Sequence, residues 1–313
     1  MIDPYAIDPG DWTEDLPGEA EPYDLNATTR RLIDPRTLPA RFHHLRAAGE
    51  CGAKVLHAFQ GDGAETLAKR LGSGTHALLF DRPLAVWRQP AKKNPKKIAP
   101  RSGDVWKKFQ IKHAGAVILT VSEHAHAQRM CDAIRGNAKA EPLLFGPGMT
   151  YEQSIIWSEC GRSRQSTPDA RGPSHNVELK TTRCAAPLPF GRDAEKMAYH
   201  AQLADQRAAI AYERQGRGPR ESYIVAVENV PPYVVQVYEV PETLLEAGDK
   251  VRLAWLERLQ VYEATDLWRG YSDRIETLEF PDRSQPTTSD PSWLGVDSTD
   301  NTEDNHGKEH RDR

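Results

Sequence analysis

The chain contains no long hydrophobic run. Its apolar stretches fall well short of the roughly 20 residues that a membrane-spanning helix needs. Its first residues, Met1–Tyr5, lack the basic and then apolar pattern of a signal peptide. We therefore expect a soluble, cytoplasmic protein with no membrane partner. Hydrophobic residues still make up 38% of the 313 residues, which is enough for a substantial core.

Cysteine is scarce as well. The four cysteines are scattered along the chain, with no C-x-x-C pair among them. This spacing argues against a zinc knuckle, a disulfide framework and an iron–sulfur cluster. We predict free, mostly buried thiols at Cys51, Cys131, Cys160 and Cys184.

Basic residues are missing from one end of the chain. Residues 1–29 contain eight acidic residues and no Lys or Arg, and residues 282–313 contain eight acidic and four basic ones. Because the net charge is −4, the segment between them, 30–281, carries a net charge of +8. Both ends are rich in Pro, Gly and small polar residues, which predicts disordered acidic tails. A basic body between acidic tails favours a polyanionic partner.

The patterns of apolar and capping residues between the tails predict an α/β protein with a small mixed sheet. Thr120 and Glu123 have the spacing of a capping box that opens a helix, and Asp193 is the expected N-cap of a long helix over 193–214. The other predicted helices are 38–59, 63–71, 104–112 and 241–268. The predicted strands are 154–157, one that precedes or includes Asp169, 177–182, 222–227 and 233–240, and residues 89–100 are predicted to be a linker.

One short motif points to chemistry. Glu178-Leu179-Lys180 is the only acid-x-Lys triplet in the chain, and it follows Pro168-Asp169 across the turn residues 171–174. Alternate residues of a strand share one face and lie about 6.5–7 Å apart, so Glu178 and Lys180 face the same side and Asp169 can reach it. The two carboxylates and the Leu179 carbonyl form an incomplete oxygen cage suited to Mg²⁺ and phosphate, with Lys180 able to orient or deprotonate a water. The alternative is a surface ion pair on an edge strand.

A basic segment with interleaved aromatic residues, 87–112, is the second feature. Asp104 is the only acid among its basic residues. Such a segment is either a solvated linker or an arm that contacts the DNA backbone without reading sequence. Trp87, Trp106 and Phe109 could stack on frayed bases, although the spacing of the last two also fits a helix core. The candidate DNA-binding residues are Lys92, Lys93, Lys96, Lys97, Arg101, Lys107 and Lys108.

Several short motifs occur in order between Gly74 and Tyr271, over about two thirds of the chain. In these motifs the sequence resembles the exodeoxyribonuclease VIII (RecE-type) nucleases of the PD-(D/E)XK superfamily, which phages and prophages often carry. The motifs are Gly74-Thr-His76, Arg101-Ser-Gly103 with Trp106 and Phe109, Gly115–Leu119, Glu152-x-Ser154-Ile-Ile-Trp157, Pro168-Asp169, Glu178–Thr182, Tyr199-His200-x-Gln202, Val227–Tyr233 and Trp268–Tyr271.

The resemblance implies a fold. We expect a restriction-endonuclease-like α/β core, with a small mixed sheet flanked by helices, preceded by an N-terminal helical region. Residues 30–281 would form the nuclease domain. Its helical and basic part would be 30–145, and its catalytic core 146–281.

The resemblance also implies a metal site. Asp169 and Glu178 would bind the metal ion together with His76, and Lys180 would be the catalytic lysine. Glu152 would lie beside the metal site. Without the resemblance, His76 is better interpreted as a helix-end or core histidine, and Glu152 as an exposed acid at a strand edge.

A helix of the family lines the DNA groove. Tyr199 and Gln202, three residues apart on one helical face, match its motif. Two positions depart from the family pattern, because Gln206 stands where a tyrosine is usual and Thr167 where a basic residue is usual. Neither is a metal ligand or the lysine, so catalysis is still expected.

The resemblance leads us to expect a Mg²⁺-dependent deoxyribonuclease, with Mn²⁺ as an alternative metal. It would be a 5′–3′ exonuclease that acts on double-stranded DNA ends in phage-type recombination. It would work with a single-strand annealing protein, as a ring-shaped homo-oligomer. Two alternatives remain open: another PD-(D/E)XK DNA nuclease, RecB-like or of the CRISPR-adaptation type, and a non-catalytic DNA-binding module that retains the fold.

Overall fold

The computed structural model describes residues 34–61, 65–91 and 94–278, and both predicted tails lie outside these ranges. None of the described helices is long and apolar enough to cross a membrane. The helices are the 3-10 helix η1 (Pro35–Thr37), α2 (Phe42–Glu50), α3 (Gly52–Gln60), α4 (Leu67–Leu79), α5 (Gly103–Lys112), α6 (Val121–Arg135), α7 (Ala140–Phe145), α8 (Pro187–Lys196), α9 (Tyr199–Glu213) and α10 (Glu242–Thr265). The strands are β1 (Leu84–Trp87), β2 (Pro90–Ala91), β3 (Asn94–Ile98), β4 (Val117–Thr120), β5 (Thr150–Tyr151), β6 (Ile155–Glu159), β7 (Arg162–Ser166), β8 (Ala170–Arg171), β9 (His175–Thr182), β10 (Glu221–Glu228) and β11 (Val235–Glu239).

The main sheet has the strand order β11-β10-β9-β8-β5. Strands β9 and β10 are parallel, and the other neighbouring pairs are antiparallel. The predicted small mixed sheet is therefore confirmed. Three smaller sheets pair β1 with β4, β2 with β3, and β6 with β7.

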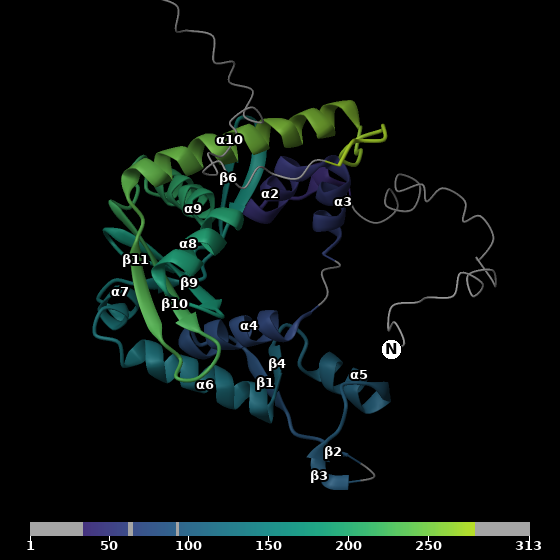
Figure 1. Ribbon diagram of the computed structural model, residues 1–313, viewed down its shortest axis with the longest axis vertical. Coiled ribbons are helices and arrows are strands. Elements are labelled where there is room, and N and C mark those ends of the chain that lie inside the picture. Colours follow the sequence, from purple (N-terminus) through teal and green to yellow (C-terminus); the bar gives the residue numbers. More distant parts are fainter. Residues whose placement is uncertain (1–33, 62–64, 92–93, 279–313) are drawn as a thin grey trace, which may run out of the picture.

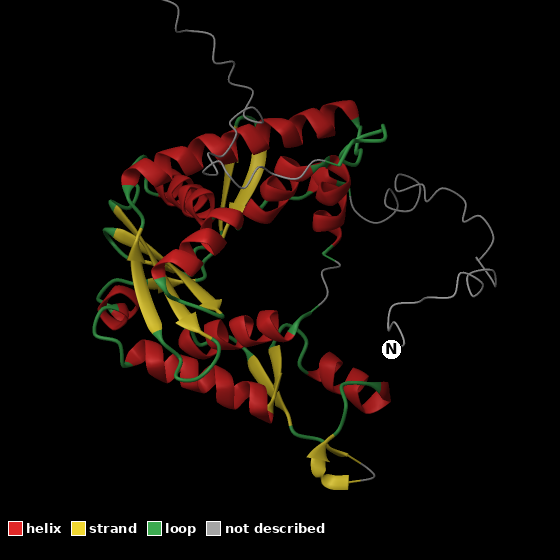
Figure 2. Cartoon of the chain, viewed as in Figure 1, coloured by secondary structure: helices red, strands yellow, loops and turns green. Residues whose placement is uncertain are grey.

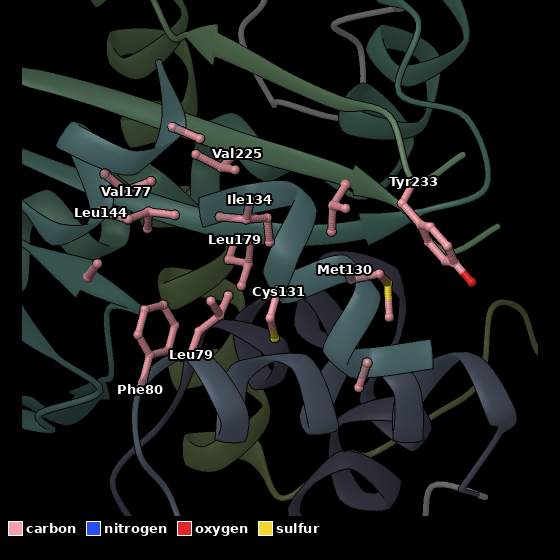
Figure 3. Close-up of a cluster of buried hydrophobic side chains, with 14 of the residues drawn as sticks. Leu79, Phe80, Met130, Cys131, Ile134, Leu144, Val177, Leu179, Val225 and Tyr233 are labelled. Carbon is pink, nitrogen blue, oxygen red and sulfur yellow. The ribbon is translucent and has the colours of Figure 1, made fainter. Parts of the chain in front are cut away.

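Helices cover both faces of the main sheet (Figures 1 and 2). The side chains of β10 alternate between two cores, which explains why this strand is apolar along most of its length. Val225 and Val227 belong to a core with α4 and α6, and Figure 3 shows Val225 there beside Val177 and Leu179. Ile224 and Ala226 face the opposite way, into a core with α8 and α9.

A third core joins the N-terminal helices α2 and α3 to α10. Figure 1 shows both short helices beside α10 and across the molecule from α4. Glycine permits the close approach, because a Cβ atom at Gly49 would lie 2.3 Å from Nε1 of Trp255. The helical region thus packs onto the C-terminal helix rather than forming a separate lobe.

Two predicted helices are each divided into two. The prediction of one helix over 38–59 was wrong, since Cys51 is extended and separates α2 from α3. The prediction of one long helix over 193–214 was wrong in the same way. Asp193 lies inside α8 instead of capping a helix, and Ala198, with φ of 55°, turns the chain into α9.

Other boundaries also differ from prediction. The predicted helix 63–71 corresponds to α4, which continues to Leu79, and residues 63 and 64 lie outside the described residues. Gly74 lets this helix pack closely on Leu119 of β4. Part of the predicted linker 89–100 forms the β2–β3 hairpin. The predicted strand 154–157 corresponds to β6, which pairs with β7 outside the main sheet. The capping box of Thr120 and Glu123 is confirmed at the start of α6.

The cysteine prediction holds in part. All four thiols are free. Cys51 and Cys131 are buried, but Cys160 is exposed and Cys184 is half-buried. The prediction of mostly buried thiols was therefore wrong for two of the four.

Candidate active site

The register of β8 and β9 brings the predicted acids and lysine together. Ala170 pairs with Val177, which places Asp169 opposite Glu178. Asp169 Oδ2 accepts a hydrogen bond of 2.8 Å from the backbone N–H of Leu179. Lys180 Nζ lies 2.6 Å from Glu178 Oε1. Asp169, Glu178 and Lys180 therefore converge as predicted from their spacing.

His76 comes to this site from the last turn of α4. Its Nδ1 lies 3.4 Å from Asp169 Oδ1 and 3.2 Å from Glu152 Oε1. Glu152, with φ of 46°, directly follows β5. Its other oxygen, Oε2, pairs with Arg82 Nε at 2.8 Å.

His76, Glu152 and Asp169 form the one group of metal-ligating side chains found in the described part of the chain. Their ligand atoms all lie within 4.8 Å of one another. Glu152 was expected only beside the metal site, so its membership of this cluster is new. Glu178 is not part of this cluster, and its carboxylate is directed at other partners.

Helix α9 supplies those partners. Gln202 Nε2 donates to Glu178 Oε1 at 2.7 Å, and Gln202 Oε1 accepts from Lys180 Nζ at 3.0 Å. The ring of Tyr199 lies 4.4 Å from the same Nζ. Both helix positions identified from the sequence thus contact the lysine.

Gln206, the position that departs from the family pattern, holds Glu178 from the other side. Its Nε2 donates to Glu178 Oε2. Its Oε1 accepts from Asn176 Nδ2 at 3.0 Å, and Asn176 Oδ1 accepts from the hydroxyl of Ser222 at 2.7 Å. All of these side chains are buried. The result is a continuous buried chain of hydrogen bonds that ends on Glu178 and leaves each amide satisfied.

The pKa values of the two carboxylates of the motif are shifted in opposite directions. Burial, reinforced by the charge of Glu178, raises the pKa of Asp169 to about 7. Burial also acts to raise the pKa of Glu178, but Lys180 and Gln206 outweigh it and the pKa falls below the ordinary value. Glu178 is therefore the carboxylate that stays ionised without a bound metal ion.

The pKa values of the two basic groups of the site, His76 and Lys180, are both raised. Burial acts to lower the pKa of His76, but the carboxylates around it, Asp169 first, raise it above the ordinary value. Burial likewise acts to lower the pKa of Lys180, and Glu178 and Asp169 reverse the effect. Two carboxylates and one imidazole that converge in a half-buried, acid-rich position fit a divalent cation, whose charge would offset that of the carboxylates.

The site opens into a cleft of about 700 Å³. The predicted residues His76, Glu152, Asp169, Glu178, Leu179 and Lys180 line it. The basic residues Arg41, Lys69 and Arg82 line it too and were not identified from the sequence. The sequence could have pointed to Lys69, because it lies seven residues before His76 and therefore on the same face of α4.

None of the described side chains of the basic segment 87–112 lines this cleft. The segment forms β2, β3 and α5, which project from the body in Figure 1. Arg101 pairs with Glu123 and donates to the Ile118 carbonyl, so its guanidinium joins this segment to α6. Lys107 and Lys108 are exposed on α5. Lys96 and Lys97 belong to β3, and Lys92 and Lys93 lie outside the described residues.

The fold is similar to that of a solved nuclease-like structure. A crystal structure of a proposed exonuclease from Eubacterium rectale matches with a TM-score of 0.52 at 13% identity, and the match covers 78% of this chain and 85% of that one. A second solved structure matches at 11% identity with a TM-score of 0.24, which is too low to support an argument. No protein-family model and no curated protein matches this chain. At these identities the likeness concerns the fold alone, which is a mixed α/β fold.

Proposed function

We propose that the protein is a metal-dependent deoxyribonuclease. The observation that supports this most directly is the meeting of His76, Glu152 and Asp169 beside the Glu178–Lys180 pair, at the wall of an open cleft. An ion pair with a purely structural role does not need a third carboxylate and an imidazole at its side. The likeness to the proposed Eubacterium rectale exonuclease agrees with this function.

His76, Glu152 and Asp169 would hold the cation, with Mg²⁺ or Mn²⁺ as the ions best suited to this donor set. When bound, such an ion supplies Lewis-acid activation of the scissile phosphate and of a water. Lys180 lies between Glu178 and Gln202 with its ammonium group charged. We therefore assign it the stabilisation of negative charge on the phosphate and the orientation of the water, rather than removal of a proton.

The cleft also carries cations for the rest of the DNA strand. Arg41 and Lys69 line it, and Arg82 lines it while paired with Glu152. Such groups bind phosphates and position the backbone without reading the bases. Lys107 and Lys108 on α5 would extend this contact to the duplex beyond the cleft.

The finer proposal follows the family resemblance. We infer a RecE-type 5′–3′ exonuclease that acts on double-stranded DNA ends in phage-type recombination, in the cytoplasm. It would assemble as a homo-oligomeric ring and deliver its product strand to a single-strand annealing protein. The order of the motifs along the chain supports this inference, as does the mixed sheet that carries the Glu178–Thr182 motif on β9.

Digestion of linear duplex DNA labelled separately at each terminus, with a closed circle alongside, tests the function. We expect loss of the 5′ label first, no cleavage of the circle, dependence on Mg²⁺ or Mn²⁺, and no activity in Lys180→Ala. Cleavage of the circle would favour another PD-(D/E)XK nuclease, RecB-like or of the CRISPR-adaptation type. DNA binding without any cleavage by the wild type would favour a non-catalytic module.

A further inference from the structure

A second, smaller cavity adjoins the cleft and has no part in the proposed reaction. Its volume is about 230 Å³. Its walls are the segment before α2, the start of α2, the end of α3, and Gln165 of β7. Arg41 lines both this cavity and the catalytic cleft. Pockets for whole cofactors usually measure about 300–1,000 Å³, so this one suits a single ring system.

Rings and apolar groups make up most of the cavity lining, and none of the described residues that line it is acidic. His44 stacks on Phe59 with ring centroids 3.7 Å apart, and the His43 ring lies 4.0 Å from that of His44. Burial lowers the pKa of both histidines, that of His44 to about 3, so the rings are uncharged at neutral pH. Leu38 and Pro39 also line the cavity. Stacked aromatic rings at the wall of a slot are the usual surface on which proteins bind single bases.

Polar groups form the boundary between the cavity and the cleft. Arg41 Nε donates to Gln165 Oε1 at 3.0 Å, and Gln165 Nε2 donates to the hydroxyl of Ser154 in the cleft at 3.2 Å. Among the described residues no ion pair engages the guanidinium of Arg41, which leaves its Nη groups available to a phosphate. A phosphate on Arg41 would bring the base of the same nucleotide within reach of the cavity.

We propose that this cavity is a binding site for an unpaired nucleobase of the DNA strand whose backbone lies in the cleft. The site accepts any of the four bases, because its ring stack recognises a flat face rather than a hydrogen-bonding edge. A base can enter only after it leaves its partner in the duplex. The cavity therefore binds DNA at a frayed end in preference to an intact duplex. That the ligand is a DNA strand rests on the proposed nuclease function.

Binding of duplexes with frayed ends tests the site. Each duplex in the series carries one abasic nucleotide at one of the first four positions from either terminus. All proteins carry Lys180→Ala so that the DNA is not cleaved during the binding measurement. We expect one position where loss of the base weakens binding about fivefold to tenfold. The His43→Ala variant should bind DNA with all its bases as weakly as the parent protein binds the DNA that is abasic at this position. Removal of the base should not weaken binding by this variant further. His57→Ala is the matched control, because His57 is exposed on α3 and lines neither space.

A second variant keeps the test independent of one side chain. Ala58 lines the cavity, so Ala58→Phe should fill it and reproduce the His43→Ala result, with folding checked by circular dichroism. The proposal is overturned if no abasic position weakens binding, or if the variants respond to base removal as the parent protein does.

The outcome separates the site from the nuclease function. Base-dependent binding in a protein that, with Lys180 intact, cleaves no DNA would leave the site standing and reject the nuclease. Cleavage without the base-dependent pattern would reject the site alone. Failure to bind DNA at all would reject both.

Discussion

Two carboxylates of one motif behave differently because their immediate neighbours differ. Glu178 accepts hydrogen bonds from Lys180, Gln202 and Gln206. Asp169 accepts one from the Leu179 backbone and otherwise faces other charged groups. The anion of Glu178 is thus stabilised by the protein itself, whereas that of Asp169 needs an added positive charge. This division suits a site that assembles fully only when a cation arrives.

Substitution of Gln206 tests whether the hydrogen bonds to Glu178 matter for the reaction. Gln206→Leu removes the donor to Glu178 and the acceptor of Asn176, both buried. We expect the free energy of unfolding to fall by about 1–3 kcal/mol. We also expect the rate of DNA cleavage at saturating DNA to fall about tenfold to a hundredfold, with DNA affinity little changed.

Tyr238→Phe is the control for Gln206→Leu. It removes a hydrogen bond from the Tyr238 hydroxyl to the Ala185 carbonyl, on the same sheet but unconnected to Glu178. It should lower stability and leave the cleavage rate unchanged. If Gln206→Leu also loses stability alone, Gln206 supports the fold and not the reaction.

His44 makes stability depend on pH. Burial, helped by the nearby charges of His43 and Arg41, lowers its pKa to about 3, whereas the unfolded chain takes up the proton near pH 6.5. The folded state therefore loses stability as the pH falls from 6.5 towards 3, by about 2 kcal/mol at pH 5. His44→Asn keeps an acceptor for the Arg41 backbone N–H, which His44 Nδ1 now provides at 3.0 Å. Urea unfolding at pH 7 and pH 5 should show a smaller loss in this variant, and equal losses would contradict the prediction.

Among the elements, α9 decides where the site residues lie. It carries Tyr199, Gln202 and Gln206 on the side that faces β9, and its opposite side packs on α10. At the crossing, a Cβ atom on Gly248 of α10 would lie 2.5 Å from the His200 carbonyl oxygen. Because the obstacle is backbone, it cannot swing aside as a flexible side chain would.

Gly248→Ala should therefore push α9 away from α10. We expect a loss of about 1–3 kcal/mol in the free energy of unfolding, together with weaker DNA cleavage because the residues around Lys180 shift. Gly191→Ala is the matched control, since Gly191 lies in α8 with nothing within 4 Å of its added Cβ. That variant should gain about 0.5–1 kcal/mol, as alanine does in a helix. Equal behaviour of the two variants, measured by urea unfolding, would show that the crossing tolerates a methyl group.

Local elements and local motifs were predictable, and the contacts between distant segments were not. The capping box of Thr120 and Glu123 and the shared face of Glu178 and Lys180 depend on residues two or three positions apart, so their geometry follows from the helix and the strand themselves. The meeting of His76 with Glu152 joins residues 76 positions apart, and only the family resemblance pointed to it. The break at Ala198 has no sequence signal, because a left-handed alanine is set by tertiary packing.

On the scale of the whole molecule, the candidate metal site joins α4 to the main sheet. His76 comes from α4, Glu152 from the turn after β5, and Asp169 from the residue before β8. These segments meet where α4 packs against the main sheet. An ion at this point would therefore link α4 to the main sheet and should stabilise the folded chain.

Thermal unfolding without DNA tests this link, because it detects the ion without requiring catalysis. A cation at a hundred times its dissociation constant should add about 2.7 kcal/mol to the free energy of unfolding, a rise of about 5–10 °C in the melting temperature for a body of this size. Glu152→Gln withdraws one charged ligand and should lose most of the rise with Mg²⁺ and Mn²⁺, whereas Glu246→Gln, a change to an exposed acid on α10, should keep it. An equal rise in Glu152→Gln would place the ion elsewhere, since an ion held by the Asp169–Glu178 pair alone would not respond to a change in the turn after β5.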